Sequence, residues 1–188
     1  MTASPTQVLT LTEFLQLPQI EESPAWEYVA GQAYQKSMPK LRHSLLQKKL
    51  VAAVDQGSDT HTALPELRCT VGGRSIAPDV AVVAWAQITT NTLGEPEDNF
   101  TAAPAWTIEI VSPGQQANRV IDNILHCLAF GCELGWLVDP DDRSIAVFRP
   151  QQQLEVVRGD RELLTLLGVN LTLTVAQIFA WLKIIKPE

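Results

Sequence analysis

The sequence predicts an α/β fold in which helices flank a mixed β-sheet. Helix-like and strand-like segments alternate along the chain, an order typical of layered α/β proteins. Two apolar runs, at residues 79–85 and 106–111, indicate buried strands. The chain has 188 residues, of which 46% are hydrophobic and 19% are charged, so it can bury a full core. We expect one domain over residues 1–188, with its core at about 11–150 and a C-terminal hairpin and helix at 151–188.

The first third of the chain predicts a short helix, a hairpin and a longer helix. The short helix covers residues 12–17, and the hairpin covers 24–36 with its turn at Ala30 and Gly31. Pro39 suits the first turn of the longer helix. One face of that helix is apolar and consists of Leu41, Leu45, Leu46, Leu50, Val51 and Val54.

The middle of the chain predicts three strands and a long loop. The strands cover residues 64–71, 79–85 and 106–111, and Gly72 with Gly73 marks a turn after the first of them. Residues 86–104 are polar and contain two prolines, which predicts an exposed, mobile loop between the second and third strands.

The last third predicts a helix at residues 118–130, ended by Gly131. Strands at 133–138 and 144–149, joined by the turn DPDDR, precede a last hairpin and a helix at 175–182 capped by Thr174. Helical periodicity divides the helix at 118–130 into two faces. The predicted apolar face consists of Val120, Ile121, Ile124, Leu125 and Leu128, and the predicted polar face consists of Arg119, Asp122, Asn123 and His126.

Composition excludes several classes of protein. No apolar run is long enough to span a bilayer, and residues 1–14 lack the pattern of a signal peptide, so we expect a cytoplasmic protein. Cys69, Cys127 and Cys132 are odd in number and form no CxxC pair. This pattern indicates reduced, buried thiols and argues against a disulfide framework or a zinc site.

Asp79 and Glu109 stand out because each lies in an apolar strand segment. A buried carboxylate is costly unless it is paired or binds a metal. If the two strands lie side by side, the carboxylates meet, and proteins bind Mg²⁺ through one or two carboxylates and several waters. The alternative is that each acid contacts water at a strand end. The spacing alone favours neither interpretation.

A basic segment follows the predicted hairpin. Between Glu27 and Asp55 the chain has no acidic residue and carries a charge of +5, although the net charge of the whole chain is −7. Such a segment either follows a phosphate backbone or forms a solvated helix face, which is the commoner case. Its basic residues are Lys36, Lys40, Arg42, Lys48 and Lys49, and His43 lies among them.

Several motifs follow one another in a distinctive order. They are PAWEYVAGQAYQKS, His43 in the next helix, APDVAVV, PAWTIEIVSP, a helix ending in FG, and ELGWLVDPDDRSIAVFRP. Over about residues 11–150 this succession resembles the Uma-two family of restriction-endonuclease-like proteins. The resemblance implies the fold of the PD-(D/E)xK nucleases, a mixed sheet flanked by helices. It also implies Mg²⁺ as the cofactor, with Mn²⁺ as a substitute, and DNA as the partner.

The resemblance also assigns residues to the site. Asp79 and Glu109 match the two acids, and Glu27 matches an acid that completes the surroundings of the metal. The lysine of such sites is commonly displaced to the following helix, where this chain has Asn123, while the strand position is Val111. The implied catalytic set is therefore Asp79, Glu109 and Asn123, with no lysine nearby. Candidate nucleic-acid contacts are Lys40, Arg42, His43 and Arg119, of which Arg119 is a substitute for the lost charge.

Three functions are compatible with these observations. The first is a Mg²⁺-dependent endonuclease acting on DNA, in which another cation replaces the lysine. The second is an inactive relative that still binds nucleic acid through the basic helix. The third is a nuclease-fold interaction protein, such as a homodimer. An opening of the basic segment onto the carboxylates would favour the first two over the third.

Overall fold

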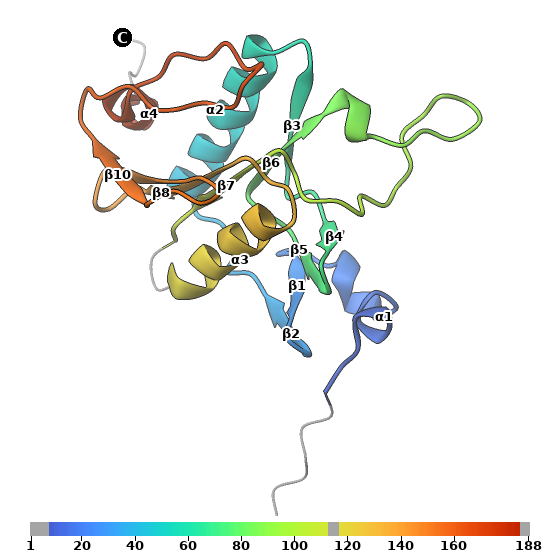
Figure 1. Ribbon diagram of the computed structural model, residues 1–188. Coiled ribbons are helices and arrows are strands. Elements are labelled where there is room, and N and C mark those ends of the chain that lie inside the picture. The colour runs from blue at the N-terminus through green and yellow to red at the C-terminus, as the bar shows by residue number, and fades with distance from the viewer. Residues whose placement is uncertain (1–7, 113–116, 185–188) are drawn as a thin grey trace, which may run out of the picture.

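A six-stranded mixed sheet forms the centre of the protein (Figure 1). The structure is a computed structural model, and it describes residues 8–112 and 117–184. Neighbouring strands follow the order β10-β9-β8-β7-β6-β3. Strands β7 and β8 are parallel, and the other neighbouring pairs are antiparallel. The strands are β3 (His61–Pro65), β6 (Val80–Ala84), β7 (Trp106–Ile110), β8 (Leu134–Asp139), β9 (Ser144–Phe148) and β10 (Glu155–Arg158).

Helices cover both faces of this sheet (Figure 1). Helix α2 (Leu41–Gly57) packs on one face, where Leu46, Leu50 and Val54 join a core that also holds α4 (Val175–Ala180). The rings of Trp106 and Trp136 meet edge to face in this core, with centroids 4.6 Å apart. Helix α3 (Ala117–Ala129) connects the parallel strands and packs on the other face. The predicted mixed α/β architecture is confirmed.

A second, four-stranded sheet with the order β2-β1-β5-β4 lies beside α3. The hairpin of β1 (Trp26–Val29) and β2 (Gln32–Gln35) turns at Ala30 and Gly31, whose φ angles are 50° and 82°, as a two-residue hairpin turn requires. The second hairpin joins β4 (Cys69–Val71) to β5 (Arg74–Ile76) through Gly72 and Gly73, also at positive φ. The N-terminal helices α1 (Leu11–Phe14) and η1 (Pro18–Glu21) precede this sheet.

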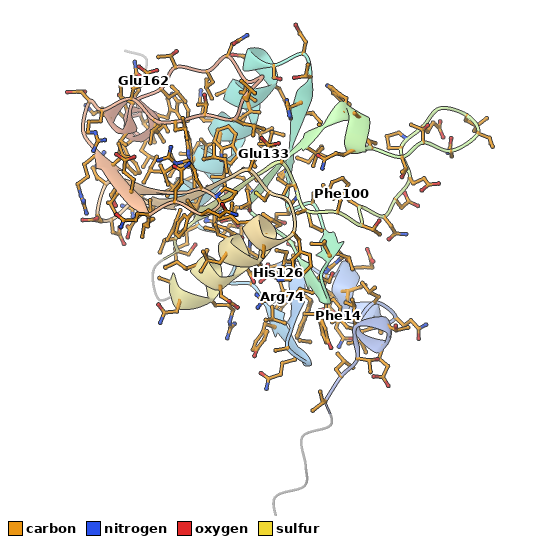
Figure 2. The ribbon with its side chains drawn as sticks, in the orientation of Figure 1. Phe14, Arg74, Phe100, His126, Glu133 and Glu162 are labelled. Carbon is orange, nitrogen blue, oxygen red and sulfur yellow. The ribbon has the colours of Figure 1, made fainter. Side chains whose placement is uncertain are left out.

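Polar contacts join the small sheet to α3. Arg74 forms an ion pair with Asp122 at 2.8 Å, and His126 Nε2 lies 2.9 Å from the carbonyl oxygen of Val71. Figure 2 shows the labelled Arg74 and His126 at the junction between α3 and the small sheet. The small sheet is therefore held against the same face of the large sheet as α3. This placement brings β1 and β2 close to the ends of β6 and β7.

Several sequence predictions about elements are wrong. Pro39 precedes Lys40, the N-cap of α2, and so is not in the first turn, and Leu41 of the predicted apolar face is 70% exposed. The strand predicted at 64–71 is two strands in different sheets, because the chain turns at Glu66, whose φ is 51°. The predicted C-terminal hairpin is reduced to β10, which pairs with β9, and a single bridge between Glu162 and Thr174. The small sheet covers the predicted polar face of α3, so Asn123 is buried while Leu125 is 50% exposed. Helix α4 is capped by Thr174 as predicted.

The loop between η2 (Trp85–Gln87) and β7 is exposed over residues 89–99, as predicted, and it projects from the body of the protein in Figure 1.

Cys69, Cys127 and Cys132 are buried free thiols, and burial raises the pKa of Cys69 and Cys132 to about 12. These thiols are therefore packing groups.

Within residues 8–112 and 117–184, no helix has the length and apolar character needed to cross a membrane. Residues 1–7, part of the segment considered for a signal peptide, lie outside the described residues, as does Pro113 of the PAWTIEIVSP motif.

Substitution of Gly135 on β8 tests whether α3 must pack as closely on this strand as the structure shows. A Cβ atom at this position would lie 2.4 Å from Cγ2 of Ile124, the neighbour of Asn123 on α3. Ile124 is fully buried and β-branched, so it has little freedom to move aside. We expect Gly135→Ala to lower the free energy of unfolding by about 1–3 kcal/mol in urea denaturation. A change within about 0.5 kcal/mol would show that the helix can shift without cost.

Candidate active site

Asp79 and Glu109 meet on one side of the large sheet. Asp79 directly precedes β6 and Glu109 lies in β7. These strands are antiparallel with Val80 opposite Ile108, so continuing the register by one residue places Asp79 opposite Glu109. Residues directly opposite each other point to the same face of a sheet. Both carboxylates are 2% exposed, so they lie within the protein and not at water-filled strand ends.

Lys36 lies between the two carboxylates. Its Nζ donates hydrogen bonds to Asp79 Oδ1 at 2.7 Å and to the carbonyl oxygen of Ala77 at 2.8 Å, and it lies 3.4 Å from Glu109 Oε2. The prediction that no lysine lies near the carboxylates is therefore wrong. The expected positions were Val111, directly after β7, and Asn123 in α3, whereas Lys36 directly follows β2 of the other sheet. The sequence shows Lys36 as the first residue of the basic segment, but its distance from Asp79 along the chain gave no indication that the two side chains meet.

Asp79 is fixed by contacts from three directions. Its Oδ2 accepts a hydrogen bond from the backbone N–H of Ile110 at 2.7 Å, and its carbonyl oxygen accepts one from Gln47 Nε2 at 2.8 Å. His43 lies one helical turn before Gln47 on α2, with Nε2 3.4 Å from Asp79 Oδ1 and Nδ1 3.2 Å from Ser112 Oγ. His43 is thus buried against a carboxylate. It also lines the pocket over the carboxylates, and its role as a nucleic-acid contact stays a prediction.

Glu27 and Asn123 form a second buried pair beside this cluster. Glu27 Oε1 accepts a hydrogen bond from the backbone N–H of Ala77 at 3.0 Å, and Oε2 accepts one from Asn123 Nδ2 at 3.1 Å. Glu27 therefore links β1, the segment before β6, and α3. Asn123 contacts this acid, and its Oδ1 is buried without a hydrogen-bond partner among the described residues. Both predicted residues are thus in the site region, where the structure shows them bonded to each other.

The buried charges shift one another's pKa values. Burial raises the pKa of Glu109 well above its usual range, and the charges of Asp79 and Glu27 add to this effect. Burial alone would raise the pKa of Asp79, but the charge of Lys36 and the hydrogen bond of His43 outweigh burial and lower it. Burial alone would lower the pKa of Lys36, but Glu109, Asp79 and Glu27 together raise it above its ordinary value. Lys36 and Asp79 are therefore both ionised at neutral pH.

The cluster lies beneath a small pocket that adjoins the basic segment. The pocket is lined by Lys36, Ser37, Pro39, His43, Glu66, Asp79 and Ser112. A neighbouring hollow shares His43 and Ser112 with it, and its other lining residues are Lys40, Leu41, Arg42, Val111 and Pro140. Lys40 and Arg42 thus line a hollow next to the pocket over Asp79, and Arg42 forms an exposed ion pair with Asp141. Two residues of the basic segment therefore lie near the acidic cluster.

Arg119 does not occupy the place of the lysine. Its guanidinium lies over the ring of Tyr34 on β2, 3.9 Å from the centroid. Within the described part of the chain it forms no ion pair with Asp79 or Glu109. The positive charge beside the carboxylates comes from the residue after β2 and not from the start of α3.

The donor atoms fit a hard cation, although they do not form a three-acid set. Among residues 8–112 and 117–184, no group of three or more His, Cys, Asp or Glu side chains is arranged to hold a metal. Glu27 is engaged by Ala77 and Asn123, so the remaining acids are Asp79 and Glu109. These two carboxylates and the Ala77 carbonyl converge on one positive group, the ammonium of Lys36. Carboxylate and carbonyl oxygens are the donors that divalent hard cations use.

Comparison with known proteins identifies the family of this chain. The Uma2 family, described as a putative restriction endonuclease, matches residues 11–176. The chain belongs to the Uma2 family. Within the solved structures, this Uma2 protein is similar to the crystal structure of a putative nuclease from Anabaena variabilis ATCC 29413. The two chains are 41% identical with a TM-score of 0.90, over 93% of this chain and 99% of that one. A search of curated proteins found no match.

The Uma2 assignment confirms the family inferred from the sequence motifs, and the solved relative confirms the restriction-endonuclease-like fold. Fold similarity alone does not establish chemistry, so the residues of the site must carry any functional conclusion.

Removing the ammonium of Lys36 tests its structural role. In Lys36→Met the two carboxylates lose their buried cation while the side-chain volume is nearly kept. We expect the free energy of unfolding to fall by about 3–5 kcal/mol, the usual cost of breaking a buried ion pair from one side. The matched control is Lys183→Met at an exposed position after α4, for which we expect a change within about 0.5 kcal/mol. Equal losses in urea denaturation would contradict a buried ionic role for Lys36.

The lowered pKa of Asp79 predicts a dependence of stability on pH. A carboxyl whose pKa is lower in the folded state than in the unfolded state stabilises the protein at pH values above the unfolded-state pKa. This contribution is lost as the pH falls toward the folded-state pKa. Asp79→Asn should therefore be about 2–3 kcal/mol less stable than the wild type at neutral pH. The difference in stability between the two proteins should become smaller as the pH falls below 3.8, the ordinary pKa of an aspartate. Urea denaturation at several pH values measures it, and a gap that stays constant on acidification would contradict the lowered pKa.

Proposed function

We propose that this Uma2 protein is a divalent-metal-dependent endonuclease that hydrolyses phosphodiester bonds in DNA. In this proposal Asp79 and Glu109 hold Mg²⁺, for which Mn²⁺ can substitute, and Lys36 supplies the cationic side chain. The observation that carries the proposal is the buried cluster in which one amine contacts both carboxylates. Such a combination of two acids and a lysine matches the chemistry implied by the PD-(D/E)xK resemblance.

Phosphodiester hydrolysis requires a nucleophilic water and positive charge near the developing negative charge on the phosphate oxygens. A bound Mg²⁺ supplies Lewis acidity and lowers the pKa of a coordinated water. Asp79 is well suited to be a metal ligand because its contacts with Ile110 and His43 fix the orientation of its two carboxylate oxygens. The pKa of Lys36 is raised, so this residue keeps its proton and acts as a positive charge and not as a base.

The position of the basic residues supports DNA as the substrate. Lys40 and Arg42 line the hollow next to the acidic cluster, where a phosphate backbone would approach. The pair between Arg42 and Asp141 is exposed, and such pairs contribute little, so the guanidinium is free to exchange partners at low cost. Because the whole chain carries a net charge of −7, we expect DNA binding to be weak and to fall steeply with salt.

The alternative of a catalytically inactive protein rested on the missing lysine. Lys36 removes that reason, since it places an ammonium within 2.7 Å of Asp79. Binding of nucleic acid without cleavage, and a homodimer, stay predictions. Glu27 and Asn123 belong in this proposal as positioning residues that join α3 to the edge of the site.

Cleavage assays test the proposal directly. Plasmid and single-stranded DNA are incubated with the wild type in Mg²⁺ or Mn²⁺. We expect cleavage that Asp79→Asn and Lys36→Met each reduce by about 100-fold or more, because each removes a charge needed in the transition state. Lys183→Met should cleave as the wild type does.

Two results would contradict the proposal. One is a folded, metal-saturated wild type that cleaves neither DNA form. The other is cleavage that persists unchanged in Asp79→Asn, which would point to a contaminating nuclease.

A further inference from the structure

The ammonium of Lys36 lies at the point where oxygen donors converge. Asp79 Oδ1, the Ala77 carbonyl oxygen and Glu109 Oε2 lie 2.7, 2.8 and 3.4 Å from its Nζ. The Lys36 side chain is only 11% exposed, so water cannot surround this amine as it would at the surface. Two carboxylates and a carbonyl are also the donor types that Mg²⁺ selects.

Two cations cannot share this position. Coordination of Mg²⁺ requires its oxygen ligands at ~2.0–2.1 Å, which is shorter than the distance from an ammonium nitrogen to a carboxylate oxygen. An ammonium left in place would lie against the metal, and like charges in a buried site repel strongly. Occupation by a metal therefore requires the ammonium to leave both carboxylates.

The chain around Lys36 allows that movement. Lys36 follows the last residue of β2, and residues 36–40 form neither helix nor strand before α2 begins. Ser37 and Met38 are exposed. Lys36 also lines the small pocket over the cluster, together with Ser37, Pro39 and Glu66. The next hollow, lined by Lys40 and Arg42, shares His43 and Ser112 with this pocket, so an ammonium that leaves the carboxylates on this side would point toward Lys40 and Arg42.

We propose that Lys36 and the divalent metal exchange at one position, so that the metal displaces the ammonium from Asp79 and Glu109 toward the mouth of the site. Lys36 thus neutralises the carboxylates before the metal binds and faces the phosphate-binding side afterwards. The exchange makes the lysine available to substrate only in the metal-bound protein. This inference deepens the proposed function and rests on it, since it concerns the order in which that site assembles.

Metal affinity tests the exchange without any measurement of cleavage. Isothermal titration calorimetry with Mn²⁺ compares the wild type, Lys36→Met and Lys183→Met. Removing a competing cation should strengthen Mn²⁺ binding to Lys36→Met by about tenfold or more, while Lys183→Met should match the wild type. Binding to Lys36→Met but not to the wild type would overturn the exchange, because it would show that the metal does not displace the ammonium. Affinity that is unchanged or weaker in Lys36→Met, or absent from both proteins, would overturn it.

A second measurement uses the wild type, in case Lys36→Met does not fold. Amines are acetylated with and without saturating Mn²⁺, and the modified peptides are measured by mass spectrometry. We expect Mn²⁺ to raise the acetylation of Lys36 several-fold relative to Lys183, because the displaced amine loses its ion pairs. Equal or lower acetylation in the Mn²⁺-bound protein would overturn the exchange. Failure of the proposed function is distinguishable, since it would appear as Mn²⁺ binding and lysine release without DNA cleavage.

Discussion

The ion pairs of Lys36 with Asp79 and Glu109 are the interaction on which the rest of the site depends. Two carboxylates on neighbouring strands, each 2% exposed, cannot both ionise without a positive partner. The ammonium permits Asp79 to stay charged while the pKa of Glu109 is raised by burial and by its acidic neighbours. The same group links the two sheets, since Lys36 follows β2, Asp79 precedes β6 and Glu109 lies in β7.

This constraint explains why the small sheet must be docked closely. Glu27 on β1 binds the backbone of Ala77 and the side chain of Asn123, so one residue of the small sheet contacts both the segment before β6 and α3. Arg74 of β5 contacts Asp122 of the same helix, and His126 of that helix contacts the carbonyl oxygen of Val71 on β4. The large sheet supplies the acids and the small sheet supplies the counter-charge. Neither sheet contains a complete site.

Much of the fold could be predicted from local patterns. The hairpin turn at Ala30 and Gly31 and the buried strands at β6 and β7 follow from turn chemistry and apolar runs, which act over a few residues. The break at Glu66 and the burial of Asn123 could not be predicted, because both depend on a second sheet whose position the sequence pattern does not encode. Asp79 and Glu109 were found because acids in apolar strands are rare. Lys36 was missed because lysine in a basic segment is ordinary and its partner lies 43 residues away.

The different origins of Lys36 and Asn123 bear on how relatives of this protein should be compared. The helix position that holds lysine in the PD-(D/E)xK resemblance holds Asn123 here, and the amine comes from the residue after β2. In this protein the positive charge beside the carboxylates therefore comes from a position that is distant in the chain from that helix position. An alignment that scores only the helix position would class this chain among degenerate members. Scoring both positions as alternatives would place it among those with a complete set of charges.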